Sequence, residues 1–101
     1  MPYGIIITKG ALKEYSEAAL WYDEQRIGLG EQFISTVRAK LVLIAENPEL
    51  FSNKHRTYRE VKIDSVFPYQ IVYRVDMKGK RIVVSAIFHT SRKPKKKYRK
   101  L

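Results

Sequence analysis

The chain has 101 residues and no cysteine, which excludes disulfides, thiolate metal sites and redox chemistry at cysteine. Its formal net charge is +10, and the excess lies in one half: residues 51–101 carry 15 basic and three acidic side chains, whereas residues 1–50 carry five basic and seven acidic ones. A cationic half of this kind predicts an anionic partner, such as a nucleic acid, a membrane surface or an acidic protein.

A chain of this length is expected to form a single domain over residues 1–101, with a basic C-terminal tail from about residue 93. The tail is equally compatible with a partner-binding segment and with a solvated extension. The only apolar run near the N-terminus, Ile5-Ile6-Ile7, is too short for a signal peptide or a membrane span. We therefore expect a cytoplasmic protein with no membrane partner.

The first half of the chain predicts one strand and two helices. Residues 3–8 are rich in β-branched side chains and predict a strand, and Thr8 could cap the following helix. Apolar residues then recur at spacings of three and four, which predicts an amphipathic helix over residues 9–27. A second such stripe predicts a helix that ends at Asn47-Pro48. Because the link Gly28-Leu29-Gly30 is short, the helices should form an antiparallel hairpin.

The second half predicts strands. Residues 49–57 are expected to form a polar loop, and residues 58–63 alternate as a strand does. The strongest strand signals are residues 69–76 and 81–88, and Met77-Lys78-Gly79-Lys80 between them offers a glycine for a tight turn. The predicted order is β-α-α-β-β-β, an α+β fold in which the helical hairpin covers one face of a small, mostly antiparallel sheet. The other face is left for function.

Alternation along the strands groups polar candidates on that free face. Gln70 and Arg74 share one side of their strand, and Ser85 and His89 share one side of the next. If the two sets coincide, these side chains line one surface near Arg92. Most aromatic residues are expected in the core or packed on the sheet, namely Tyr15, Trp21, Tyr22, Phe33, Tyr69 and Tyr73. No phosphate-binding glycine loop or metal-ligand cluster is evident, so no cofactor or metal is expected.

Several segments, taken in order, match a known pattern over nearly the whole chain. They are Tyr22, Gly28-Leu29-Gly30-Glu31-Gln32-Phe33, Asn47-Pro48-Glu49-Leu50-Phe51, Tyr58-Arg59-Glu60, Phe67-Pro68-Tyr69-Gln70-Ile71-Val72-Tyr73-Arg74-Val75 and Phe88-His89-Thr90-Ser91-Arg92-Lys93-Pro94. Each motif is weak alone, whereas their order and spacing are specific. Together they resemble the RelE/ParE superfamily of toxins from type II toxin–antitoxin systems.

The resemblance implies a RelE-like two-layer fold and a growth-inhibiting toxin of the kind associated with plasmid stabilisation. It also implies a cognate antitoxin, acidic or partly disordered, that wraps the toxin and blocks its basic surface. The charge asymmetry of the chain independently favours an acidic partner. Operator DNA would be bound only through the antitoxin complex.

The superfamily divides by target. ParE-like members poison DNA gyrase, whereas RelE-like members are metal-independent endoribonucleases that cut messenger RNA on the ribosome. RNA cleavage needs groups that accept and donate protons and cations that stabilise the phosphate. The resemblance assigns these roles to His89 as acid or base, Arg59 and Arg92 on the phosphate, and Tyr98 near the C-terminus. Candidates for target binding are Gln70, Arg74, Lys93, Lys95, Lys96 and Lys97.

The His89-Thr90-Ser91-Arg92-Lys93-Pro94 ending and the Gly28-Leu29-Gly30 link resemble the ParE-like branch more closely, and two departures from the ribonuclease pattern argue against RelE-type cleavage. Gln70 stands where arginine is usual, and glutamine cannot neutralise a phosphate. Val61 stands where a RelE-like enzyme tends to present a lysine. The alternatives are a RelE-like ribonuclease and a non-toxic member that binds only antitoxin and operator DNA. On the plain interpretation, His89 is a structural hydrogen-bonding residue.

Overall fold

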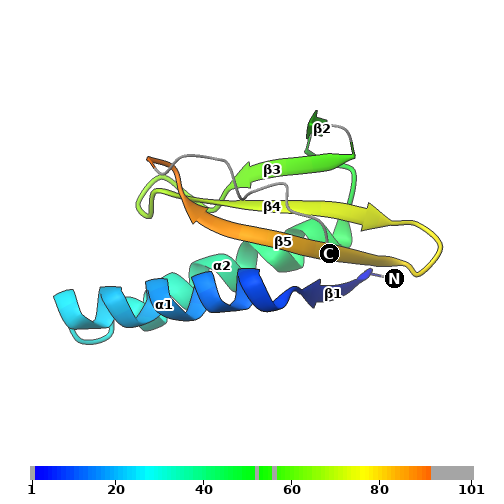
Figure 1. Ribbon diagram of the computed structural model, residues 1–101. Coiled ribbons are helices and arrows are strands. Elements are labelled where there is room, and N and C mark those ends of the chain that lie inside the picture. Colours follow the sequence, from blue (N-terminus) through cyan, green and yellow to red (C-terminus); the bar gives the residue numbers. More distant parts are fainter. Residues whose placement is uncertain (1, 52, 56, 92–101) are drawn as a thin grey trace.

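The computed structural model describes residues 2–51, 53–55 and 57–91, with backbone alone for residues 53–55. The elements in chain order are β1 (Gly4–Ile7), α1 (Lys9–Gln25), α2 (Leu29–Glu46), β2 (Asn53–His55), β3 (Tyr58–Lys62), β4 (Tyr69–Asp76) and β5 (Arg81–His89). Figure 1 shows two layers, with both helices on one side of the sheet. The α+β class and the covering helical hairpin are confirmed. The predicted polar loop was wrong in part, because it contains the short strand β2.

The five strands are arranged in the order β1-β5-β4-β3-β2. Among the strands that the structure describes, β1 runs parallel to its neighbour, β5, and the three other strand pairs are antiparallel. The mostly antiparallel sheet predicted from the sequence is therefore confirmed. In the described ranges, no helix is both long and apolar enough to cross a membrane.

The helical hairpin is defined by an N-cap at its start, a glycine at its turn and a hydrogen bond between its two helices. Helix α1 begins after Thr8, whose Oγ1 accepts a hydrogen bond from Ala11 N at 3.2 Å, as an N-cap does. Gly28 makes the reversal with φ of 90°, in the left-handed region that favours glycine. Gly30 was predicted in the link but lies inside α2, where its N–H donates to Asp23 Oδ1 at 2.8 Å. The link is therefore residues 26–28.

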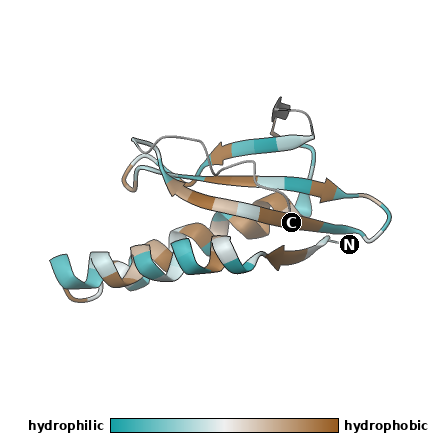
Figure 2. Cartoon of the chain, viewed as in Figure 1, coloured by the Kyte–Doolittle hydropathy of each residue, from teal (hydrophilic) through white to brown (hydrophobic). Residues whose placement is uncertain are grey.

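The main core lies between the helices and the sheet, and its centre is aromatic. Phe33 is fully buried, and its ring centroid lies 5.0 to 6.0 Å from the rings of Tyr15, Tyr22, Phe67 and Tyr69. Figure 2 shows the hydrophobic colour dominating β5 and alternating with hydrophilic colour along β4 and the helices. Burial of these rings against the sheet fixes the helical layer in place.

A β-bulge interrupts the β4–β5 ladder. Val72 pairs with Ala86 but Tyr73 pairs with Val84, so Ser85 is the extra residue. Ser85 is fully buried, and its Oγ donates to Val72 O at 3.3 Å. The bulge shifts the alternation of β5 by one residue beyond Ser85. Every side chain from there to the end of the strand therefore points to the face opposite to that predicted.

The face of the sheet away from the helices is not a polar surface. Val72, Ala86 and Phe88 form a second buried apolar cluster there, and Tyr58 packs against it. The prediction that this face is left free for function was therefore wrong at its centre. Polar side chains on this face lie around the cluster rather than across it.

Three tyrosines make the fold sensitive to alkaline pH. Burial raises the pKa of Tyr15, Tyr22 and Tyr73 above the ordinary value of 10.0. The folded state therefore favours the neutral phenol, and this contribution is complete below about pH 10 and lost as the pH rises above it. We expect the free energy of unfolding, measured in urea, to fall between pH 9 and about pH 11.

Tyr73→Phe isolates this effect from the deprotonation of lysines. Tyr73 Oη donates to Pro48 O at 3.3 Å, so the variant should lose about 1 kcal/mol at pH 8. Its further loss between pH 9 and 11 should be smaller than that of the wild type, since one phenol no longer titrates. An equal fall in both proteins would show that buried Tyr73 does not contribute to the alkaline transition.

Candidate functional site

The predicted polar surface is divided between the two faces of the sheet. His89 pairs with Tyr69 and shares its face, on the side of the helices. Gln70 pairs with Phe88 and Arg74 pairs with Val83, which places both on the opposite face. The prediction that Gln70, Arg74, Ser85 and His89 line one surface was therefore wrong, because the bulge at Ser85 reverses the end of β5.

Arg59 lies on the helix side but far from His89. It pairs with Tyr73, whereas His89 pairs with Tyr69, and four residues of strand correspond to about 13 Å. The Arg59 guanidinium donates to Phe51 O and so holds the segment that follows α2. The structure does not bring these two candidates together. The remaining candidates lie outside the described residues, namely Arg92, Lys93, Lys95, Lys96, Lys97 and Tyr98.

His89 lines a groove of about 680 Å³ between α1 and the ends of β4 and β5. The wall from α1 contributes Glu14, Glu17, Trp21 and Tyr22, and the loop before β4 contributes Val66 and Pro68. In Figure 1, α1 and β5 run in the same direction, so the last residues of β5 lie beside the middle of α1. The groove therefore lies toward the end of the molecule where residues 26–28 link α1 to α2.

The ring of His89 is fixed by its neighbours. Nδ1 accepts a hydrogen bond from Ser91 N at 3.1 Å and lies 2.7 Å from Ser91 Oγ, and the ring packs edge-on against Tyr69 with centroids 5.3 Å apart. A backbone N–H can only donate, so the neutral imidazole carries its proton on Nε2. A ring held in this way can donate a hydrogen bond from Nε2.

The groove is acidic. Glu14 and Glu17 line it, and Glu14 Oε1 accepts a hydrogen bond from Ile87 N at 3.1 Å, beyond the point where β1 stops pairing with β5. Among the described residues that line this groove there is no lysine or arginine. A phosphodiester approaching His89 would therefore meet two carboxylates and no described cation, which is unfavourable. The arrangement suits a neutral or cationic ligand better.

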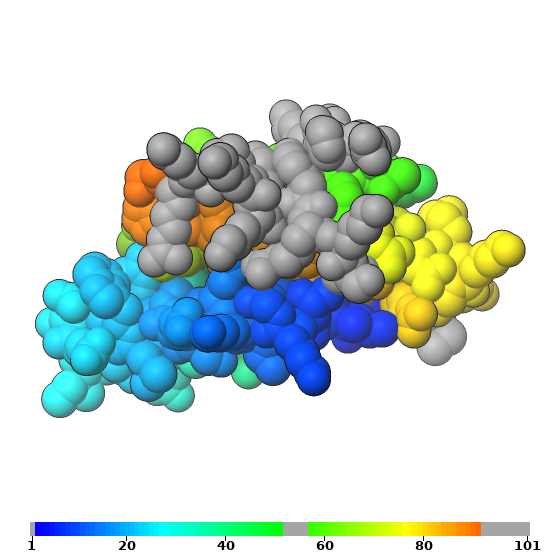
Figure 3. Space-filling view, in the orientation of Figure 1, coloured from blue at the N-terminus to red at the C-terminus, as the bar shows by residue number. Residues whose placement is uncertain are grey.

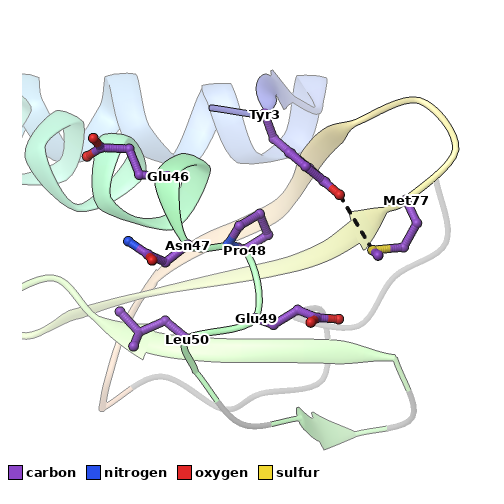
Figure 4. Close-up of a pocket in the computed structure, with 7 residues that line it drawn as sticks. All are labelled: Tyr3, Glu46, Asn47, Pro48, Glu49, Leu50 and Met77. Atoms are coloured by element: carbon purple, nitrogen blue, oxygen red, sulfur yellow. Dashed lines mark hydrogen bonds between the residues drawn. The ribbon is translucent and has the colours of Figure 1, made fainter. Parts of the chain in front are cut away.

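Other hollows offer less chemistry. Figure 4 shows the pocket of about 400 Å³ at the end of α2, where Tyr3 Oη points to Met77 Sδ at 3.7 Å and the acidic side chains are Glu46 and Glu49. Two hollows of about 660 and 430 Å³ lie along α2 and share Ser35 and Thr36. Within residues 2–51, 53–55 and 57–91, no group of three or more metal-binding side chains could hold an ion.

Two candidate functional features were not predicted from the sequence. Trp21 was expected to be buried but is 54% exposed at the rim of the groove. The β4–β5 turn carries Lys78, Lys80 and Arg81, and in Figure 3 this hairpin projects in yellow from the body. Gly79 N and Arg81 Nε both donate to Asp76, which lowers the pKa of its carboxyl group and braces the turn. The cationic turn could have been found from the sequence, because Lys78, Lys80 and Arg81 lie within four residues of one another.

The fold is similar to that of solved toxins. A toxin–antitoxin structure described as the chromosomal ParDE system from P. aeruginosa matches with a TM-score of 0.73 and 12% identity, over 88% of this chain and 97% of that chain. The intact E. coli RelBE toxin–antitoxin complex matches with a TM-score of 0.66 and 25% identity, over 89% and 99% of the two chains. Isolated E. coli RelE matches with a TM-score of 0.67 and 23% identity, over 90% and 87%.

These similarities show that the chain has the two-layer fold of these toxins. A comparison with curated proteins found no match. The family model described as the ParE toxin of the type II toxin–antitoxin system parDE matches residues 5–94. The chain therefore belongs to the ParE toxin family.

Proposed function

We propose that this toxin stops bacterial growth by poisoning DNA gyrase, and that a cognate acidic antitoxin neutralises it. The observation that carries the proposal is the placement of His89. Its groove is lined by Glu14 and Glu17, and the sheet separates it from Gln70 and Arg74. A ribonuclease needs its proton-transfer group and its phosphate-binding cations around one phosphodiester. A gyrase poison cuts nothing itself and does not need this arrangement.

The antitoxin proposal rests on charge and on the relatives. The E. coli RelBE and P. aeruginosa ParDE structures are toxin–antitoxin systems. In this chain the net charge of +10 and the cationic β4–β5 turn favour an acidic partner, which electrostatic attraction would steer to the toxin. Binding to operator DNA would then occur through the complex.

The test uses His89→Asn. The Oδ1 atom of asparagine can replace Nδ1 as the acceptor for Ser91 N, but asparagine cannot exchange a proton. We expect the variant to inhibit supercoiling of relaxed plasmid by purified gyrase as strongly as the wild type, and to arrest growth equally. Loss of an acid–base group would instead weaken a nuclease by about 100-fold or more.

The results with His89→Asn distinguish a gyrase poison from a ribonuclease. The matched control is the wild-type toxin mixed with its antitoxin, which should leave gyrase unaffected. If the free wild-type toxin arrests growth but does not affect supercoiling, and His89→Asn no longer arrests growth, the gyrase proposal is wrong.

A second candidate function is ribosome-dependent cleavage of messenger RNA, with His89 as a hydrogen-bond donor to the reacting phosphate. The hydrogen bond from Ser91 N favours this function, because it fixes the proton of the neutral ring on Nε2, from which it can donate. Sequencing the 5′ ends of messenger RNA after induction tests it: discrete cuts that disappear in His89→Asn would support it. A chain that does not arrest growth when induced alone would be the third alternative, a non-toxic member that binds antitoxin and operator DNA.

A further inference from the structure

A large aromatic side chain is exposed at the rim of the His89 groove. Trp21 is 54% exposed and Val66, across the groove, is 73% exposed. The Trp21 ring lies edge-on to that of Tyr22, with centroids 5.1 Å apart. Tryptophan is among the residues most enriched at the energetic centres of protein interfaces. The apolar rim therefore has the composition of a docking surface.

The charge of this region is opposite to that of the whole protein. Residues 14–31 carry five carboxylates and a single cation, Arg26, in a chain with a net charge of +10. Glu14 and Glu17 line the same groove as Trp21. A ligand that fits must therefore combine positive charge with a surface that can pack on an indole ring, as arginine and lysine side chains do.

We propose that the groove rimmed by Trp21 and Glu17 docks a basic segment of the protein that the toxin inhibits. This inference rests on the proposed function, which supplies a protein target. Enzymes that act on DNA carry basic surfaces where the nucleic acid binds. Such a surface repels most of this cationic toxin but attracts its acidic groove.

The geometry gives the docked toxin an orientation. Arg81 and His89 are at the two ends of β5, and eight residues of strand span about 26 Å. When the groove contacts the target protein, the turn with Lys78, Lys80 and Arg81 faces away from that contact. In this orientation the cationic turn is not covered by the docked protein.

The test compares three variants of the full-length toxin. Trp21→Ala removes the anchor, and Glu17→Lys reverses an exposed charge at the same groove. Leu12→Ala is the matched control, because Leu12 is an apolar residue of the same helix, 49% exposed and outside the groove. The measurements are growth arrest after induction without antitoxin and the toxin concentration that halves gyrase supercoiling.

We expect Trp21→Ala and Glu17→Lys each to raise the half-inhibitory concentration by about tenfold or more and to abolish growth arrest, while Leu12→Ala behaves as the wild type. Melting temperature and antitoxin binding verify that the variants are folded. Because Glu17 is exposed, Glu17→Lys is expected to fold even if Trp21→Ala does not.

Each other outcome is decisive. Growth arrest by both groove variants at the wild-type level would overturn the docking proposal while leaving the gyrase proposal intact. If Trp21→Ala is inactive but Glu17→Lys is fully active, the partner is not basic, and the proposal is wrong. If the wild type arrests growth without affecting gyrase, the proposed target is wrong, and growth arrest by the groove variants still decides whether the groove is used. A non-toxic wild type would overturn both.

Discussion

Phe33→Ala is expected to lower the free energy of unfolding by about 3 to 5 kcal/mol. Phe33 is fully buried, and four other aromatic rings surround it. The substitution removes the apolar area that Phe33 buries and leaves a cavity whose walls belong to different elements. Tyr15 and Tyr22 come from α1, whereas Phe67 and Tyr69 come from the loop and strand that face it. These walls cannot collapse together without moving the helices relative to the sheet.

Urea unfolding followed by circular dichroism measures this loss. Domains of this size have a total stability of about 5 to 15 kcal/mol, so the variant should be partly unfolded at moderate temperature. Leu20→Ala is the control, because Leu20 is 66% exposed and its loss should change stability by about 0.5 kcal/mol or less. If Phe33→Ala lowers the free energy of unfolding by less than about 1 kcal/mol, the aromatic cluster is not the centre of the core.

Gly30→Ala is expected to have the second largest effect, a loss of about 3 kcal/mol. A Cβ atom at this position would lie 2.3 Å from Ala19 O and 2.8 Å from the carboxyl group of Asp23. The first atom is backbone of the facing helix, so relief requires the helices to separate. The same movement breaks the hydrogen bond from Gly30 N to Asp23 Oδ1. Alanine is the better helix former by about 1 kcal/mol, so the steric cost must exceed that gain.

Two other glycines serve as controls for this prediction, measured by the same unfolding titration. At Gly4 a Cβ atom would meet nothing closer than 3.7 Å, so Gly4→Ala should be close to neutral. At Gly28 there is open space but φ is 90°, a conformation that is strained for alanine. Gly28→Ala should therefore lower the free energy of unfolding by only about 1 kcal/mol. A Gly30→Ala variant as stable as the wild type would rule out close helix contact at this residue.

The parts of the fold that depend on local pattern were predictable from the sequence. The strand over residues 69–76 was predicted with its observed bounds, and the second helix ends one residue before Asn47-Pro48. Thr8 caps α1 as expected. In each case the signal lies within a few residues, as a spacing of apolar side chains or a proline that disfavours helix.

What depends on pairing between distant segments was not predictable. The bulge at Ser85 follows from how β5 fits β4, and no glycine or proline marks it in the sequence. That one residue moved His89 to the helix side and separated it from Gln70 and Arg74. The exposure of Trp21 was missed for a related reason, since the apolar stripe of α1 does not show where the opposite wall of the groove ends.

The parallel pairing of β1 with β5 has a consequence for how the protein folds. Gly4 pairs with Arg81, so the first strand has no partner until the last described strand has been synthesised. Contacts between segments so far apart carry a large loop-closure entropy and slow the folding reaction. Because β5 also lies between β1 and β4, the sheet is split without it. Formation of the toxin fold is thereby coupled to the synthesis of β5, and a chain that stops before residue 81 leaves β1 and much of the helical hairpin without the strand they pack on.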